Sequence, residues 1–98
     1  MQQTRTIEII RANSDAIRRH GATALYVFGS RSRGNSDDES DLDVFVDYDP
    51  KQTFSLFNLV RIKRALEALT GVPTDVTTRD SLRPETRAEI EADAVRVF

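Results

Sequence analysis

A glycine turn followed, ten residues later, by two carboxylates constrains the fold of this chain more than any other feature. The apolar runs 25–28 and 44–46 contain no Gly or Pro, so each predicts a strand. Asp41 and Asp43 open the second run. Side chains alternate between the two faces of a strand, so we expect these two carboxylates to point the same way.

This arrangement predicts a site that holds both a cation and phosphate groups. Two close carboxylates repel each other by about 4 kcal/mol at an effective dielectric near 20, and a hard divalent ion usually offsets that repulsion. Gly29 and Ser30 form the turn after the first strand, and backbone amides in such a turn can cradle phosphate oxygens. The stretch therefore indicates a metal-bound nucleoside triphosphate.

The Gly-Ser turn and the Asp-x-Asp, ten residues apart and each next to a predicted strand, resemble the signature of the DNA polymerase beta-type nucleotidyltransferase superfamily. Two arginines and a glycine follow the turn, and the chain is short. With these features it is most similar to the minimal nucleotidyltransferases (MNT). Members of that group are often antitoxins encoded beside HEPN-family toxins.

The resemblance implies a nucleotidyltransferase fold, α/β (α+β) in class, and a Mg²⁺-dependent reaction with ATP as substrate. AMP would pass from ATP to a hydroxyl. In the antitoxins that the chain resembles, the acceptor is a tyrosine of the partner HEPN-type RNase toxin, which AMPylation silences. Two alternatives stay open: an antitoxin that neutralises its partner by binding alone, and a nucleotidyltransferase that acts on a small molecule.

Three carboxylates are the candidate catalytic residues and the candidate ligands of two Mg²⁺ ions, namely Asp41, Asp43 and Asp75. Asp75 lies in the predicted strand 73–78, where the resembled family has its third acid. Acids are depleted in strands, so its presence asks for a reason. Two other interpretations remain, an exposed acid on an edge strand or an ion-pair partner of Arg79.

Gly29, Ser30 and Arg33 are the candidate nucleotide-binding residues. The resemblance implies that Gly29 and Ser30 hold the triphosphate. The guanidinium of Arg33 matches the geometry of a phosphate group. Arg33 and its neighbour Arg31 would serve equally well to neutralise the acidic run 37–39.

The rest of the pattern predicts one domain over residues 1–98, a mixed sheet of three to four strands with helices packed on it. A short link makes the second strand antiparallel to the first, and a helical crossover makes the third parallel to the second. The predicted helices are 6–20, 53 or 55 to 70, and 84–93, and the predicted strands are 23–28, 41–47 and 73–78, with 95–98 as a short edge strand.

Composition excludes several functions. The 98 residues carry a net charge of −2, so no basic footprint favours nucleic acid as a partner. The absence of cysteine excludes disulfides, thiolate metal sites and a cysteine nucleophile. No apolar run reaches the ~20 residues of a membrane span and no signal-peptide pattern opens the chain, so we expect a cytoplasmic protein with no membrane partner.

Three further polar residues are expected to lie outside the reaction. His20, the only histidine, suits a solvated position at a helix end. Tyr48 is expected in a loop, with stacking on a nucleotide base as its alternative. Asp47 shares the face of the two strand carboxylates, but lies more than about 10 Å from them along the strand.

The chain is nearly all catalytic core, so the acceptor is expected to bring its own binding surface, as a HEPN-family toxin would. The apolar arc of the predicted helix over 56–69 looks wider than one sheet contact needs, which favours partner binding. The alternative is a helix that is simply well buried in a small domain. Homo-oligomers and hetero-oligomers are both left open.

Overall fold

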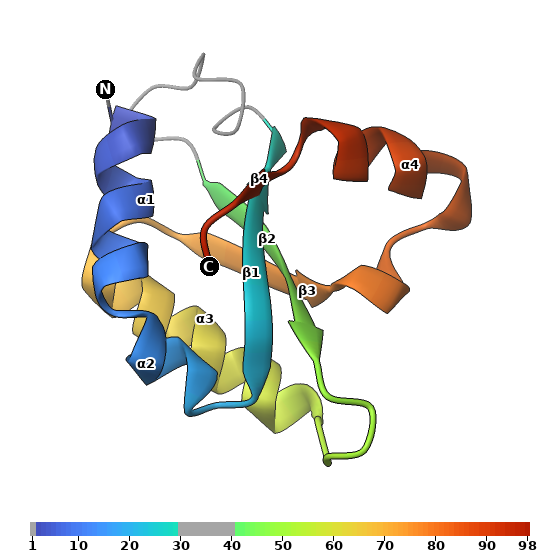
Figure 1. Cartoon of the computed structure of the whole chain (residues 1–98). Coiled ribbons are helices and arrows are strands. Elements are labelled where there is room, and N and C mark those ends of the chain that lie inside the picture. The colour runs from blue at the N-terminus through green and yellow to red at the C-terminus, as the bar shows by residue number, and fades with distance from the viewer. Residues whose placement is uncertain (1, 30–40) are drawn as a thin grey trace.

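A four-stranded mixed sheet forms the centre of the computed structural model, which describes residues 2–29 and 41–98 (Figure 1). Its strands are β1 Ala22–Phe28, β2 Leu42–Tyr48, β3 Thr74–Thr78 and β4 Val95–Arg96. The strand order is β3-β2-β1-β4. β1 pairs antiparallel with β2 and with β4, while β2 pairs parallel with β3. The predicted mixed sheet, its strand directions and its short edge strand are confirmed.

Four α-helices and one 3-10 helix complete the described part of the chain. They are α1 Gln2–Ala12, α2 Ser14–Arg18, α3 Leu56–Thr70, the 3-10 helix η2 Arg79–Ser81 and α4 Pro84–Asp93. The single helix predicted over 6–20 is wrong, because Asn13 divides it. The Asn13 side chain donates to the carbonyl of Ile9 at 2.8 Å, and such local bonds compete with the helical pattern. In the described chain, no helix has the length and apolar content needed to cross a membrane.

The hydrophobic core lies between one face of the sheet and the helices α1, α2 and α3, which pack together on one side (Figure 1). Alternate residues of the two central strands point into it. Its fully buried members are Ile10, Ile17, Leu25, Val27, Leu42, Val44, Val46, Ile62 and Leu66. The other residues of β2 therefore face away from these helices, toward the side on which α4 lies.

Helix α3 begins and ends as its sequence predicts. Asn58 accepts a hydrogen bond from the backbone N–H of Ser55 at 2.9 Å, and Gly71 ends the helix with a φ of +76°. Its first turn, however, leaves Leu56 74% and Phe57 73% exposed. The interpretation that the whole apolar arc is buried is therefore wrong at this turn.

Candidate active site

Two carboxylates lie side by side at one end of the sheet. Asp43 of β2 is in register with Asp75 of the parallel strand β3 and with Phe28 of the antiparallel strand β1. Paired residues of neighbouring strands point to the same face, and the strands lie about 4.8 Å apart. Asp41 comes one residue before β2 and is exposed, as is Asp75. The register therefore brings Asp43 and Asp75 together at one end of the sheet, with Asp41 just before β2 at the same end.

Burial and like charges raise the pKa of Asp43. Partial burial of its carboxyl group makes the largest contribution, and the negative charges of Asp75 and Asp41 add to it. A cluster of carboxylate oxygens is the donor set that Mg²⁺ prefers. Within residues 2–29 and 41–98, no three acidic or histidine side chains are already arranged to hold a metal ion. As metal ligands, these three residues thus stay a prediction.

Gly29 brings the backbone directly against this cluster. Its φ is +80°, a conformation that L side chains rarely adopt. A Cβ added there would lie 3.1 Å from Oδ2 of Asp43. The turn after β1 thus needs glycine for two reasons, its backbone angle and its contact with a candidate ligand. The predicted partners Ser30, Arg31 and Arg33 lie outside the described residues.

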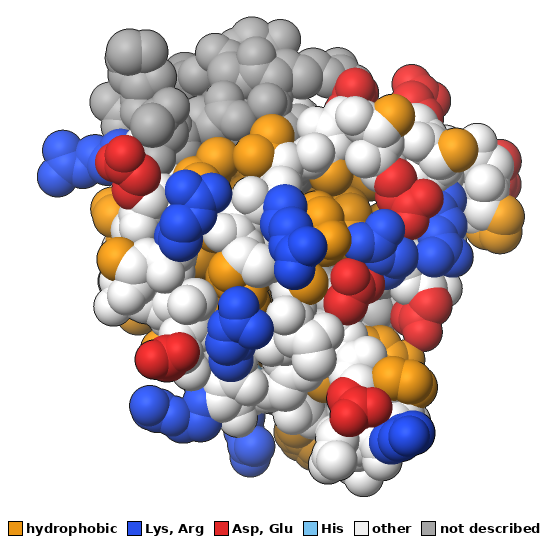
Figure 2. All heavy atoms as spheres, viewed as in Figure 1, with side chains coloured by type: hydrophobic (Ala, Val, Ile, Leu, Met, Phe, Trp, Pro, Cys, Tyr) orange, Lys and Arg blue, Asp and Glu red, His pale blue; other side chains and the backbone are white. Residues whose placement is uncertain are grey.

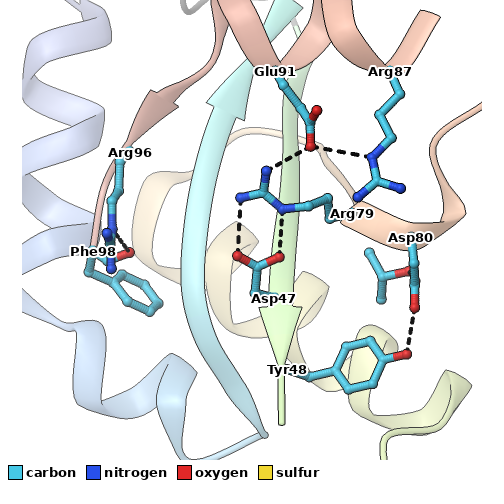
Figure 3. Close-up of polar contacts among 9 residues, drawn as sticks. Asp47, Tyr48, Arg79, Asp80, Arg87, Glu91, Arg96 and Phe98 are labelled. Carbon is cyan, nitrogen blue, oxygen red and sulfur yellow. Dashed lines mark hydrogen bonds and ion pairs between the residues drawn. The ribbon is translucent and has the colours of Figure 1, made fainter. Parts of the chain in front are cut away.

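Asp47, four residues along β2 from Asp43, is engaged elsewhere. Arg79 donates to its two carboxylate oxygens at 2.8 and 3.1 Å and to Glu91 of α4 at 2.7 Å (Figure 3). Among the ion pairs of the described chain, those of Arg79 go to Asp47 and Glu91. The alternative in which Asp75 is the ion-pair partner of Arg79 is therefore wrong.

The Arg79 guanidinium also covers the aromatic part of this face. It lies 4.8 Å from the ring centre of Tyr26 and 5.0 Å from that of Phe45. Hydrogen bonds to Asp47 and Glu91 raise the pKa of Arg79, so it stays charged. Sequence reasoning missed this cluster, because nothing in the spacing of the residues linked η2 to β2 and α4. The rings and the two acids together fix Arg79, and Arg79 fixes α4 to the sheet.

Tyr48 and His20 lie away from the carboxylates. Tyr48 ends β2, about 16 Å along the strand from Asp43, and its hydroxyl donates to Asp80 at 2.8 Å. The expected loop position of Tyr48 is wrong, because Tyr48 is the last residue of β2. His20 follows α2 and lines a cavity of about 480 Å³ that Tyr48 also lines.

The mixed sheet, the glycine turn and the in-register carboxylates at one end have the arrangement expected of a nucleotidyl-transferring enzyme. Residues 8–97 match the nucleotidyltransferase domain family, and the chain belongs to that family. It is thus a nucleotidyltransferase, as the resemblance implied.

The chain is similar to several known proteins. "Putative protein adenylyltransferase MJ0435" of Methanocaldococcus jannaschii is 34% identical over 91 residues, which cover 93% of this chain and 96% of the relative. A solved structure described as a "putative minimal nucleotidyltransferase" is 35% identical, with a TM-score of 0.73 and coverage of 91% of this chain and 93% of its own. The Shewanella oneidensis complex of a tri-AMPylated HEPN toxin with its MNT antitoxin shares the fold, at 18% identity and a TM-score of 0.65, covering 100% of this chain and 72% of the other.

Proposed function

We propose that this chain is a Mg²⁺-dependent protein adenylyltransferase that moves AMP from ATP to a tyrosine hydroxyl of a HEPN-type toxin and thereby acts as its antitoxin. The observation that carries the proposal is the register of Asp43 with Asp75, beside the Gly29 backbone. The protein adenylyltransferase relative and the HEPN–MNT complex support the choice of acceptor.

The carboxylates Asp41, Asp43 and Asp75 are the proposed ligands of two Mg²⁺ ions. Bound there, the ions would supply positive charge to the attacking and leaving oxygens of an in-line displacement. The donor set fits, because all three side chains offer hard oxygen ligands and act on one another electrostatically at Asp43. The Gly29 turn would hold the triphosphate in line with the acceptor.

The proposed reaction is a single displacement at the α-phosphorus of ATP. The acceptor oxygen forms a bond to that phosphorus while the bond from phosphorus to the pyrophosphate oxygen breaks, and pyrophosphate leaves with the electron pair. The proton of the acceptor hydroxyl passes to a carboxylate, for which Asp75 is the candidate. Asp75 suits this part because it is exposed at the open edge of the cluster.

Label transfer from α-³²P-ATP to protein tests this proposal directly. Wild type with Mg²⁺ is expected to label a HEPN-type protein, and the Asp41→Asn/Asp43→Asn double variant is expected to leave it unlabelled. Asp49→Asn is the matched control, because Asp49 follows the far end of β2. Equal labelling by the double variant would overturn the proposed site, and Mg²⁺-dependent labelling of a small molecule would redirect the acceptor.

Neutralisation of the partner by binding alone is the second candidate for the antitoxin role, favoured by the exposed side chains of Leu56 and Phe57. Adjacent exposed apolar residues often belong to a protein interface. Toxicity assays with the double variant separate the two functions. Full neutralisation by Asp41→Asn/Asp43→Asn would mean that binding alone suffices, whereas lost neutralisation with retained binding would mean that transfer is needed.

A further inference from the structure

A cavity opens beside Gly29, between the end of β1 and α4. Its volume is about 300 Å³, and it is lined by Phe28, Gly29, Thr86, Glu89, Ile90 and Asp93. The four helix residues recur at i, i+3, i+4 and i+7, so one face of α4 forms a wall. A volume of this size lies at the lower end of the range for small-molecule sites. Nothing in the sequence pattern linked this helix face to the turn.

The side chains that line this cavity determine which chemical groups of a ligand can bind there. The Glu89 side chain makes no hydrogen bond or ion pair with another residue of the described chain. An ionised carboxylate only accepts hydrogen bonds, so it repels phosphate and favours hydroxyl or amino donors. Phe28 and Ile90 offer apolar contact on the same cavity. On the face shown in Figure 2, acidic side chains gather toward the side where α4 lies.

The strand order puts this cavity on a definite side of the cluster. β2, which carries Asp43, lies between β1 and β3, so Gly29 and Asp75 flank it on opposite sides. The cavity adjoins Gly29, where the triphosphate is proposed to bind, and lies away from Asp75, where the acceptor is proposed to lose its proton.

We propose that this cavity holds the nucleoside half of the bound nucleoside triphosphate. The base packs against Phe28 and Ile90, and Glu89 accepts a hydrogen bond from a hydroxyl or amino group of the nucleoside. The assignment rests on the proposed function, because it needs the phosphates at Gly29 and the carboxylates. It adds nucleotide-binding residues on α4, outside the glycine turn.

The position of α4, which forms one wall of the cavity, depends on ion pairs. None of the α4 side chains is buried, so apolar packing contributes little to its placement. Glu91 accepts from Arg79 at 2.7 Å and from Arg87 at 3.3 Å (Figure 3). Arg79 is thus a positioning residue for the cavity, since it joins α4 to Asp47 of the sheet.

Comparison of ATP with inorganic tripolyphosphate isolates the nucleoside contribution. Both affinities are measured with Mg²⁺ by calorimetry, for wild type, Glu89→Ala, Ile90→Ala and the matched control Glu85→Ala on the same helix. Wild type is expected to bind ATP at least about tenfold tighter than tripolyphosphate. Glu89→Ala and Ile90→Ala should each lower that ratio about three- to tenfold, and Glu85→Ala should leave it unchanged. The ratio cancels any general effect of charge on phosphate binding.

The outcomes separate this assignment from the proposed function. If wild type binds ATP and tripolyphosphate equally, or if the ratio of the two affinities is unchanged in both variants, the nucleoside lies outside this cavity. The proposed phosphate site would be unaffected by that result. If wild type binds neither ATP nor tripolyphosphate, the proposed function fails and the nucleoside cavity fails with it. A ratio that falls in Glu85→Ala as much as in Glu89→Ala would also overturn the assignment.

Discussion

At the scale of single residues, Gly29 lies so close to Asp43 that a side chain at position 29 would crowd the Asp43 carboxylate. A side chain at position 29 meets both an unfavourable φ of +80° and Oδ2 of Asp43 at 3.1 Å. We expect Gly29→Ala to lower the free energy of unfolding by about 1–2 kcal/mol and to weaken ATP binding, because the carboxylate must shift. Chemical denaturation and nucleotide titration measure the two effects.

Gly71→Ala is the matched control for that variant. Gly71 has a similar φ of +76°, but a Cβ there would meet no atom within 4 Å. It should therefore show the same loss of stability without any change in ATP affinity. An equal loss of ATP affinity in both variants would mean that Gly29 acts only through the general stability of the fold.

Asp43 illustrates a conflict between stability and function at one residue. Partial burial and the charges of Asp75 and Asp41 raise its pKa, which means that the folded chain disfavours its ionised form. We expect Asp43→Asn to raise the melting temperature in EDTA and to abolish the increase that Mg²⁺ gives the wild type. Thermal unfolding with and without Mg²⁺ measures both, and a wild-type melting temperature indifferent to Mg²⁺ would contradict the ligand role.

At the scale of elements, α4 is held by a branched ion pair and not by a buried stripe. A lysine cannot reproduce the fork by which Arg79 reaches Asp47 and Glu91 together. We therefore expect Arg79→Lys to speed amide hydrogen exchange in α4 while β1 and β2 keep their protection. Arg64→Lys, at an exposed position of α3, is the control. Unchanged protection of α4 would show that other contacts place it.

The same ion pairs predict a pH dependence. Hydrogen bonds from Arg79, and then from Arg87, hold the pKa of Glu91 below its ordinary value of 4.5. A carboxylate with a lowered folded pKa stabilises the fold above its unfolded pKa, and this contribution is lost as the pH falls through the folded value. The stability difference between wild type and Glu91→Gln should therefore shrink as the pH falls below about 4.5. A constant difference would contradict the pairing.

The sequence predicts most elements here because their signals are local. Pro84 at the first turn correctly predicted where α4 begins, and the alternation of apolar residues correctly predicted β2. The division of the first helix at Asn13 escaped prediction, because its apolar face continues through the break. The Arg79 cluster and the cavity beside Gly29 depend on contacts between distant elements, and no spacing along the chain encodes those contacts.

At the scale of the whole molecule, the carboxylate cluster and the exposed apolar turn of α3 lie at opposite ends. β2 runs from the cluster to Tyr48, and α3 starts beyond the loop that follows it (Figure 1). The cluster also faces away from the helices α1 to α3. A partner that docks on Leu56 and Phe57 would therefore leave the proposed catalytic face uncovered, and it would have to reach around the sheet to bring an acceptor hydroxyl to that face.

Substitution of this turn separates partner binding from nucleotide binding. Leu56→Ser/Phe57→Ser should change the free energy of unfolding by less than about 0.5 kcal/mol, because both side chains are exposed, and should leave Mg²⁺–ATP binding intact. We expect it to reduce co-purification with the proposed HEPN-type partner and AMP transfer to that partner together, whereas Ala68→Ser on the same helix should change neither. Normal complex formation and labelling by the double variant would contradict a docking role for this turn and place the interface on another surface.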